Sequence, residues 1–469
     1  MTTTAPPERY DLVVLGSGPA GQKAAIAAAK LGKRVALADA SLDLGGACVH
    51  TGTIPSKTLR EAILYLTGWL QRGSEGLTHP ATERITIAEL SRRVTLVVAR
   101  EVEVIRDQLS RNRVEIVPGH GRFVGPNQVA IELPGGERHI EAERALIATG
   151  SRPAHSATVA VDGERILDSD QLLDPRLADR SLPRSMIVVG AGVIGLEYAS
   201  MLTALRCEVT VIDARDSMLE FVDGEILEAL VYHLRASGTV FRLGERVDSV
   251  TRADDGRVLA HLASGKRVHG DALLYTVGRQ GNTEGLGLEA IGLDADARGR
   301  LEVDASFRTR CPWVWAAGDV IGFPALASTS MEQGRLAACA MFGTPANHMP
   351  HLHPYGIFTI PEISMVGATE QELTGKSVPY EIGIARFEDL AKGQMSGDRS
   401  GMLKLLFDPV GFRLLGVHVI GAGAADLVHI GQTALALGGT IEWFRDAVFN
   451  YPTLAEAYKV AALDGFNRL

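Results

Sequence analysis

The sequence predicts an α/β fold with two domains built on parallel sheets and a third, α+β domain towards the C-terminal end. The prediction of parallel sheets rests on two glycine-rich turns. They begin at Gly16 and Gly190, and each follows an apolar run and precedes a helical pattern. From His351 onward, strand-like runs alternate with helices instead. A chain of 469 residues is too long for one hydrophobic core, so several domains are expected.

The first turn lies between an apolar run and an alanine-rich helix that reaches about Lys30, and the next strand ends at Asp39. Its glycines are Gly16, Gly18 and Gly21. In such a turn the first glycine makes the bend, the second lets a pyrophosphate approach the backbone, and the third lets helix and strand pack closely. The helix N-terminus then faces the phosphates.

The second turn repeats this arrangement with a helix to about Leu205 and a strand that ends at Asp213. Its glycines are Gly190, Gly192 and Gly195. The repetition indicates two Rossmann-like dinucleotide-binding units. Asp39 and Asp213 follow their first glycine at the same distance, and each would bind ribose hydroxyls. We expect a tightly held FAD at the first unit and an exchangeable NAD or NADP at the second.

Arg215 stands two residues beyond Asp213. An acidic residue at the strand end favours NAD, because it pairs with the 2′-hydroxyl and repels a 2′-phosphate. A nearby arginine accommodates that phosphate. The pair predicts a site that accepts either cofactor, unless Arg215 is an ordinary surface charge.

Composition narrows the class of protein. The net charge of −9 argues against nucleic acid or an anionic membrane as partner. The four cysteines are scattered without metal-ligand spacing, which predicts no metal site and suits a reducing cytoplasm. The N-terminal residues do not resemble a signal peptide, and prolines break the longest uncharged stretch, 336–361. We therefore expect a cytoplasmic protein.

Between and after the two units the pattern predicts connecting elements. An amphipathic helix is expected over 86–110, and hairpin strands over 121–147 lead to Thr149 and Gly150. A second strand-to-turn glycine is Gly278, and another strand ends at Gly318-Asp319, where the aspartate could bind a ribityl hydroxyl. In the third domain, strand-like runs cover 355–366, 380–385, 402–407 and 414–420, and helices are expected near 424–437 and 453–468.

Together these motifs resemble the class I pyridine nucleotide–disulfide oxidoreductase family over essentially the whole chain. The residues that carry the resemblance are Gly16-x-Gly18-x-x-Gly21, Gly45-Gly46-x-Cys48, Ile54-Pro55-Ser56-Lys57, Ala148-Thr149-Gly150, Gly190-x-Gly192-x-x-Gly195-Leu196-Glu197, Gly318-Asp319 and Pro452-Thr453-x-x-Glu456. The resemblance implies a glutathione reductase-like fold and a homodimer or higher homo-oligomer. It implies an FAD domain over 1–153 and 280–350, an NAD(P) domain over 154–279 and an interface domain over 351–469.

Two departures from the family's pattern concern thiol chemistry. The family carries Cys-x4-Cys before Ile-Pro-Ser-Lys, but here Cys48 is followed by Thr53, which cannot form a disulfide. The family's C-terminal His-Pro-Thr-x-x-Glu, whose histidine serves the partner subunit's thiol, begins with Tyr451. Within the family, these segments resemble the soluble, Si-specific transhydrogenases. That resemblance implies hydride transfer between NADPH and NAD+ in a ping-pong reaction through reduced flavin.

The family resemblance also implies roles for single residues. Lys57 and Glu197 would form a catalytic ion pair near the flavin, and Lys57 would contact the cofactor. Gly46, Cys48, Thr149, Gly150, Gly278 and Asp319 would line the cofactor sites. Cys48 and its neighbour His50 are expected to be structural. Two other functions stay open: an NAD(P)H:quinone or small-acceptor reductase, and, more remotely, a flavin-bound interaction protein.

Overall fold

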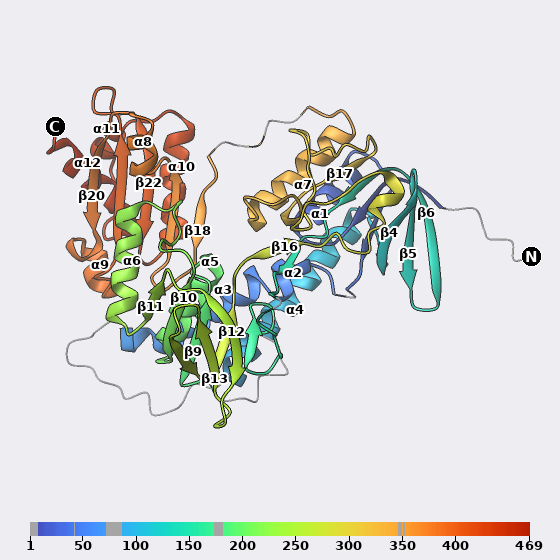
Figure 1. Ribbon diagram of the computed structural model, residues 1–469. Coiled ribbons are helices and arrows are strands. Elements are labelled where there is room, and N and C mark those ends of the chain that lie inside the picture. Colours follow the sequence, from blue (N-terminus) through green and yellow to red (C-terminus); the bar gives the residue numbers. More distant parts are fainter. Residues whose placement is uncertain are drawn as a thin grey trace, which may run out of the picture.

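The computed structural model describes residues 8–41, 43–71, 87–156, 158–172, 182–345, 349 and 352–469. Three groups of elements follow one another in space, and we call them the first, second and third domain. Figure 1 shows the first and third domains at opposite ends of the molecule, with the second between them. The limit expected between 350 and 351 lies outside the described residues.

The first domain is built on one large sheet. Its strands β1, β2, β3 and β17 pair in parallel with each other or with β6, while β4 and β5 continue the sheet as antiparallel hairpins. The strand order is β3-β2-β1-β6-β5-β4, with β17 also beside β6. The elements are β1 (Glu8–Leu15), α1 (Pro19–Lys30), β2 (Val35–Asp39), α2 (Gly46–His50), α3 (Thr53–Gln71), α4 (Ile87–Arg111), β3 (Glu115–Pro118), β4 (His120–Gly125), β5 (Gln128–Leu133), β6 (Gly136–Ile147), η2 (Leu288–Ile291), β17 (Val314–Ala316), η3 (Asp319–Ile321) and α7 (Ala327–Met341).

The second domain has a parallel sheet in the order β11-β10-β9-β15-β8 and a small antiparallel sheet, β12-β13-β14. Its elements are β8 (Ile166–Asp168), β9 (Ser185–Val189), α5 (Val193–Ala204), β10 (Glu208–Asp213), α6 (Gly224–Ala236), β11 (Val240–Leu243), β12 (Val247–Arg252), β13 (Val258–Leu262), β14 (Arg267–Gly270) and β15 (Ala272–Tyr275). The chain leaves the first domain through β7 (Ser151–Pro153) and returns through β16 (Arg279–Gly281). These two strands pair antiparallel and form the crossing between the domains.

The third domain is an antiparallel sheet, β18-β19-β22-β21-β20, with helices packed on it. Its elements are β18 (Tyr355–Ile357), β19 (Ile363–Gly367), α8 (Glu370–Gly375), β20 (Glu381–Arg386), η4 (Phe387–Asp389), α9 (Ala391–Ser396), β21 (Met402–Phe407), β22 (Leu414–Ile420), α10 (Ala424–Ala436), α11 (Ile441–Asp446), η5 (Leu454–Glu456) and α12 (Ala457–Phe466). The predicted α/β fold, with two Rossmann-like domains and a C-terminal α+β domain, is confirmed.

One strand prediction is wrong. The run 355–366 is not continuous, because β18 ends at Ile357 and β19 begins at Ile363. The amide groups of Phe358 and Ile360 donate to side chains of α5 instead of a neighbouring strand. Pro361 has no amide hydrogen to offer. The interruption therefore points this segment at the second domain.

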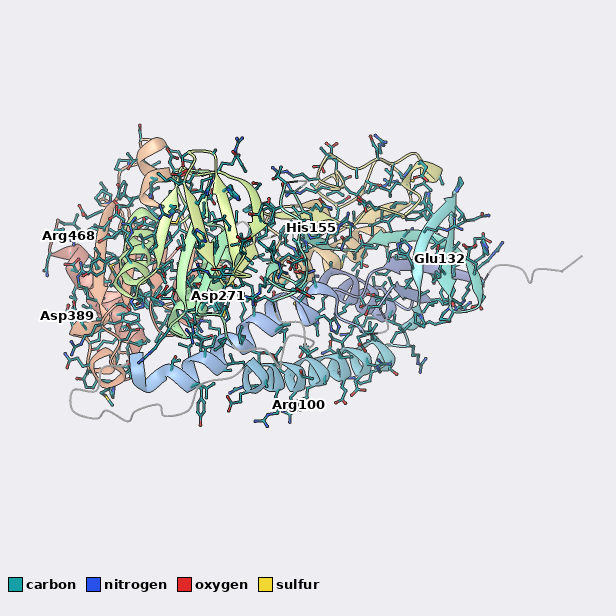
Figure 2. All side chains as sticks on the ribbon, turned by 60° about the horizontal axis from the view of Figure 1, so that its bottom comes forward. Arg100, Glu132, His155, Asp271, Asp389 and Arg468 are labelled. Atoms are coloured by element: carbon teal, nitrogen blue, oxygen red, sulfur yellow. The ribbon has the colours of Figure 1, made fainter. Side chains whose placement is uncertain are left out.

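A shared core joins the domains. One hydrophobic cluster contains Ile63 of α3, Leu202 of α5 and Ile363 of β19, so it includes all three domains. Figure 2 shows α3 and α4 running along one side of the molecule, with exposed Arg100 on the outside of α4. Within the described residues, no helix combines the length and the apolar character needed to cross a membrane.

Candidate active site at the junction of three domains

The first glycine turn is held by close backbone contacts. Gly16 has a φ of +105°, and a Cβ on it would lie 2.4 Å from the carbonyl oxygen of Ala148. A Cβ on Gly21 would lie 1.9 Å from the Gly16 carbonyl oxygen. Gly46, at the start of α2, packs so closely on Gly18 that a Cβ would lie 3.1 Å from the Gly18 Cα. The turn, the end of β6 and the start of α2 therefore meet at one place.

Asp39 ends β2 beside this turn. Its Oδ2 accepts a hydrogen bond from the Ser17 amide at 2.6 Å, and its Oδ1 accepts one from the Ser41 amide at 2.8 Å. These two amides fix the carboxylate at the carboxyl end of the parallel strands, which is where dinucleotides bind in such folds.

The second turn has the same geometry. Gly190 has a φ of +108°, and a Cβ on it would lie 2.6 Å from the Thr276 carbonyl oxygen. A Cβ on Gly195 would lie 2.0 Å from the Gly190 carbonyl oxygen. At Gly192, by contrast, a Cβ would meet no atom within 4 Å. The protein's own packing does not require glycine there, and the open space fits a pyrophosphate that approaches the backbone.

Gly150 and Gly278 share this openness, since a Cβ at either position would meet no atom within 4 Å. Both follow the ends of strands, β6 and β15, that lie beside a glycine turn. Thr149 is turned towards the crossing, where its hydroxyl donates to the Asn282 carbonyl oxygen at 2.7 Å. The residues of both turns therefore fit dinucleotides.

Arg215 folds back onto Asp213. Its Nε lies 3.0 Å from Asp213 Oδ1 and its Nη2 lies 2.8 Å from Asp213 Oδ2, while the Ala191 amide also donates to Oδ2 at 2.7 Å. Burial alone would raise the pKa of Asp213, but these hydrogen bonds lower it below its ordinary value. Asp213 is buried and Arg215 is more than half exposed, so the guanidinium can leave the carboxylate without opening the fold.

Lys57 and Glu197 are brought together from different domains. Lys57 lies on α3 and Glu197 on α5, and Lys57 Nζ is 2.6 Å from Glu197 Oε2. The side chain of Glu197 is 5% exposed and that of Lys57 is 25% exposed. The pair joins α3 to the first part of α5, just beyond the second glycine turn, and α2, which carries Cys48, packs against α3.

The third domain completes this contact through residues that the sequence analysis missed. The Phe358 amide donates to Glu197 Oε1 at 2.9 Å, and Lys57 Nζ lies 4.9 Å from the centre of the Phe358 ring. Beside them, Arg60 of α3 contacts Glu362 Oε2 at 2.9 Å and the Thr359 carbonyl oxygen at 3.0 Å. The sequence offered one signal for this contact: Pro361 lies inside an apparent strand, where proline indicates an interruption of the pairing.

The surroundings of Cys48 do not activate its thiol. It is a free cysteine on α2, and burial raises its pKa although a hydrogen bond with Thr53 opposes this shift. The ring of His50 bonds to the Leu44 carbonyl oxygen at 3.0 Å. The thiol is therefore kept neutral near physiological pH, and Thr53 stands in the position of a resolving sulfur.

Asp319 begins η3 at the end of β17, and its Oδ2 accepts a hydrogen bond from the Ser151 hydroxyl at 2.7 Å. A Cβ on Gly318 would lie 3.1 Å from the Cβ of Ala20, so this segment packs on α1 beside the first turn. Asp319 therefore lies beside the first glycine turn.

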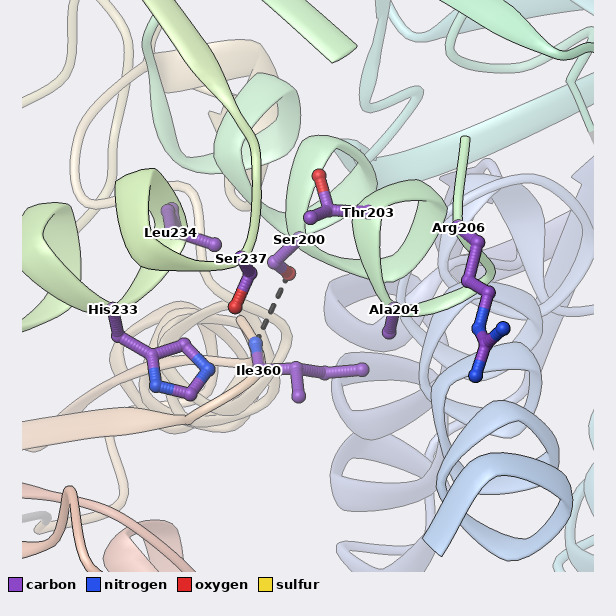
Figure 3. Close-up of a pocket in the computed structure, with 8 residues that line it drawn as sticks. All are labelled: Ser200, Thr203, Ala204, Arg206, His233, Leu234, Ser237 and Ile360. Atoms are coloured by element: carbon purple, nitrogen blue, oxygen red, sulfur yellow. Dashed lines mark hydrogen bonds between the residues drawn. The ribbon is translucent and has the colours of Figure 1, made fainter. Parts of the chain in front are cut away.

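A cavity of about 260 Å³ lies between the C-terminal ends of α5 and α6 and Ile360 (Figure 3). Its wall includes Ser200, whose hydroxyl accepts a hydrogen bond from the Ile360 amide at 3.0 Å. None of the residues expected to bind cofactor lines it.

Comparison with known proteins places these features in a family. The family model for pyridine nucleotide-disulphide oxidoreductases matches residues 10–334, and the model for the dimerisation domain of the same group matches residues 353–462. The chain belongs to the pyridine nucleotide-disulphide oxidoreductase family. Members of this family bind FAD and NAD(P), in agreement with the two turns.

Three relatives within the family are named soluble pyridine nucleotide transhydrogenase. The protein from Mycobacterium tuberculosis is 53% identical over 98% of both chains. The protein from Marinomonas sp. is 45% identical over 98% of this chain and 99% of its own. The protein from Escherichia coli is 43% identical over 98% of both.

Solved structures of the family have the same architecture. The crystal structure of LpdA from Mycobacterium tuberculosis matches with a TM-score of 0.88 and 30% identity, over 97% of this chain and 99% of that one. The flavoprotein disulfide reductase RclA from Escherichia coli matches with a TM-score of 0.87, and at 24% identity over 97% of this chain and 99% of its own it shows the fold alone.

Proposed function

We propose that this chain is a soluble pyridine nucleotide transhydrogenase, which moves hydride between NADPH and NAD+. One observation carries the proposal: the site keeps both dinucleotide turns and the Lys57–Glu197 pair, while Thr53 stands where a redox disulfide would need its second sulfur. The name shared by relatives of 43–53% identity supports the same reaction.

We assign FAD to the first domain, where Gly16, Gly18, Gly21, Asp39 and Gly46 would hold its pyrophosphate and ribose. Cys48, Lys57, Thr149, Gly150 and Asp319 would line the rest of that site. We assign the nicotinamide dinucleotides to the second domain. There Gly190, Gly192, Gly195, Asp213, Arg215 and Gly278 would bind them.

FAD, when bound, would supply reversible hydride chemistry, so that one nucleotide site could serve NADPH and NAD+ in turn. The protein's part is to orient and to balance charge. Lys57 would place a positive charge beside the cofactor, where negative charge grows on reduction. Glu197 would hold Lys57 in place, and Phe358 fixes the other oxygen of Glu197.

Arg215 is our candidate for acceptance of both nucleotides. With NAD, Asp213 would bond the ribose hydroxyls; with NADP, the guanidinium would turn from Asp213 to the 2′-phosphate. The dimerisation domain supports a homodimer, and we propose that the protein acts as such in the cytoplasm.

Anaerobic transhydrogenation by the purified yellow protein tests the function. NADPH is mixed with thio-NAD+, and the absorbance of reduced thionicotinamide is followed. Turnover with parallel lines in double-reciprocal plots is expected, because the two nucleotides use one site in turn. Flavin that bleaches with NADPH but does not reduce thio-NAD+ would contradict the proposal and favour a quinone or small-acceptor reductase.

A further inference from the structure

Four polar side chains form a continuous chain across the crossing between the first and second domains. At its centre is Arg279, the first residue of β16. Its Nη1 lies 3.0 Å from Asp170 Oδ1 in the second domain. Its Nε lies 2.9 Å from the hydroxyl of Ser151, and its Nη2 lies 2.7 Å from the Ser151 carbonyl oxygen. Ser151 in turn contacts Asp319 Oδ2 at 2.7 Å.

The direction of each hydrogen bond in this chain follows from the groups involved. A guanidinium can only donate, so the Ser151 oxygen must accept from Arg279. The single hydroxyl proton of Ser151 is then free to point at Asp319, and it donates to Oδ2. Among the described residues, no donor contacts the other oxygen of Asp319, which can take a hydroxyl of a bound cofactor.

The chain is well placed to hold its geometry. Ser151 is buried, and the side chains of Arg279 and Asp170 are about three-quarters buried. Hydrogen bonds that involve charged groups and lie away from water are stronger than neutral, exposed ones. Arg279 of β16 donates to both the hydroxyl and the carbonyl oxygen of Ser151 of β7. A shift of either strand must therefore move the other.

We propose that Arg279 and Ser151 are positioning residues, which fix the Asp319 carboxylate for FAD and set how the second domain meets the first. The inference rests on the proposed function in assigning FAD to the first domain and nicotinamide to the second. Neither residue needs to touch a reacting atom. Arg279 acts on Asp319 through Ser151, and through Asp170 it ties that carboxylate to the domain that presents the nicotinamide.

Ser151→Ala tests the link to Asp319 in the FAD-loaded protein. Loss of one hydrogen bond to a carboxylate predicts roughly tenfold weaker FAD binding, measured by fluorescence on removal and return of the cofactor. The visible absorption bands of the flavin should shift, and anaerobic bleaching by NADPH should slow. Ser156→Ala, a partly exposed serine on the same connection that bonds only to Thr158 among the described side chains, is the matched control and should change none of these.

Arg279→Lys tests the action through Ser151. The lysine keeps a positive charge, but its compact ammonium group cannot reproduce the three contacts of the guanidinium with the hydroxyl and carbonyl of Ser151 and with Asp170. It should weaken FAD binding in the natural background and have little further effect when Ser151 is already alanine. Additive effects of the two substitutions would overturn the proposed route through the serine.

FAD affinity and absorption bands that stay at natural values in Ser151→Ala would overturn the role of the serine. If that variant did not fold, Ser151→Thr, which retains the hydroxyl, would replace it: loss of FAD affinity despite a folded protein and an intact hydroxyl would contradict the inference. None of these readouts requires NAD+ to be reduced. If the natural protein bound FAD but failed to reduce thio-NAD+, the proposed function would be refuted. The FAD-binding measurements on the variants would still test the roles of Ser151 and Arg279.

Discussion

Glu197 is the residue at which the three domains converge. Its carboxylate contacts Lys57 Nζ at 2.6 Å and the Phe358 amide at 2.9 Å. Glu197→Ala removes both contacts and leaves Lys57 without its partner. Because misplacement of a positioning group by about 1 Å can cost on the order of 100-fold in rate, we expect a loss of that size in anaerobic flavin bleaching by NADPH. FAD should be retained, and stopped-flow absorbance measures the rate.

Glu228→Ala is the matched control for this variant, because Glu228 is an exposed glutamate on α6 of the same domain. It should bleach as fast as the natural protein. An unchanged rate in Glu197→Ala would contradict the assignment. An equal loss in both variants would instead point to damage of the second domain as a whole.

Cys48 is predicted to be a poor nucleophile. Burial raises its pKa above the ordinary thiol value, so below that pKa the thiolate fraction is smaller than in a free cysteine. Alkylation by iodoacetamide should be slow near neutral pH and should keep rising with pH after a free thiol levels off. Mass spectrometry of the modified peptides measures the rate for each cysteine.

Cys207 supplies an internal reference for that experiment, because burial raises its pKa to about 12. It should react more slowly than Cys48. A Cys48 that is alkylated near neutral pH as fast as a free cysteine would show that the thiol is activated after all, and would reopen thiol chemistry for this site.

At the scale of elements, local patterns predicted most of the fold. The helix expected over 86–110 is α4 (Ile87–Arg111), and the hairpin strands over 121–147 are β4, β5 and β6. Both depend on periodicity along a single segment. The prediction of one strand over 355–366 was wrong because the backbone between β18 and β19 bonds to Glu197 and Ser200, which lie far away in sequence. No local pattern records such a partner.

The segment between β18 and β19 gives a prediction of its own. Ser200 of α5 accepts a hydrogen bond from the Ile360 amide at 3.0 Å, and both residues are buried. Ser200→Ala leaves that amide without a partner, which costs about 1–3 kcal/mol. Urea unfolding should show this loss in the free energy of unfolding. Ser217→Ala, at a partly exposed serine whose hydroxyl contacts Glu220, should cost much less.

A loss in Ser200→Ala no greater than in Ser217→Ala would mean that the Ile360 amide finds another partner. Because Glu197 lies on the same helix, flavin bleaching should be measured in parallel. A slower rate would indicate that the Ile360 contact also keeps Phe358 on Glu197.

For the molecule as a whole, the family resemblance predicted one contact between domains, that of Lys57 with Glu197, but local sequence patterns did not predict the others. The glycines and aspartates of both turns could be identified because their spacing is local. The joints between domains, such as Glu197 with Phe358 and Arg279 with Ser151, connect positions more than 100 residues apart. They depend on how three folded units pack, and such information is spread over the entire chain.

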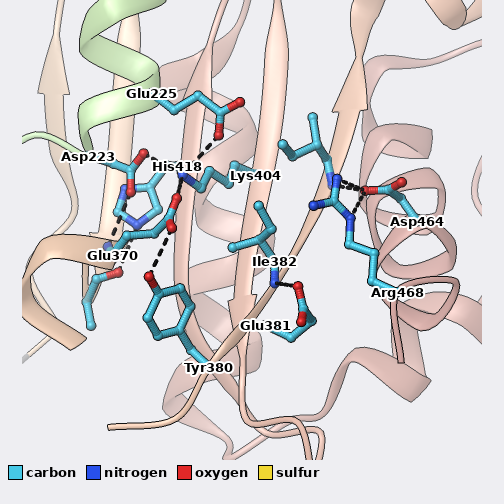
Figure 4. A network of polar contacts seen from close by, with 12 residues as sticks. Asp223, Glu225, Glu370, Tyr380, Glu381, Ile382, Lys404, His418, Asp464 and Arg468 are labelled. Atoms are coloured by element: carbon cyan, nitrogen blue, oxygen red, sulfur yellow. Dashed lines mark hydrogen bonds and ion pairs between the residues drawn. The ribbon is translucent and has the colours of Figure 1, made fainter. Parts of the chain in front are cut away.

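The joint between the second and third domains is a buried charge cluster (Figure 4). Lys404 of β21 and Asp223, next to α6, are both 0% exposed, and Lys404 Nζ lies 2.8 Å from Asp223 Oδ1. Glu225 and Glu370 also contact this ammonium group. His418 adds no positive charge near neutral pH, because burial lowers its pKa. Lys404 therefore balances three carboxylates of the two domains.

Lys404→Met should destabilise the protein by about 3–5 kcal/mol, because Asp223 would remain buried without its cation. Burial alone would raise the pKa of Asp223, but its hydrogen bonds and neighbouring charges hold it below the ordinary value. In the natural protein this group thus adds stability above the pKa of an unfolded aspartate, and the contribution is lost as pH falls through the lower, folded value. Urea unfolding from neutral to acidic pH measures both the loss and its pH dependence.

Asp223→Asn combined with Lys404→Met separates the charge pair from general packing. If the cost of Lys404→Met comes from a stranded carboxylate, the double variant should lose less stability than the sum of the two single variants. It should also lose much of the acid dependence, since the titrating carboxylate is gone. Strict additivity would mean that the two charges do not hold the domains together. Slower transhydrogenation with FAD retained in the double variant would link this joint to the nucleotide site, because the loop between Arg215 and Asp223 connects them.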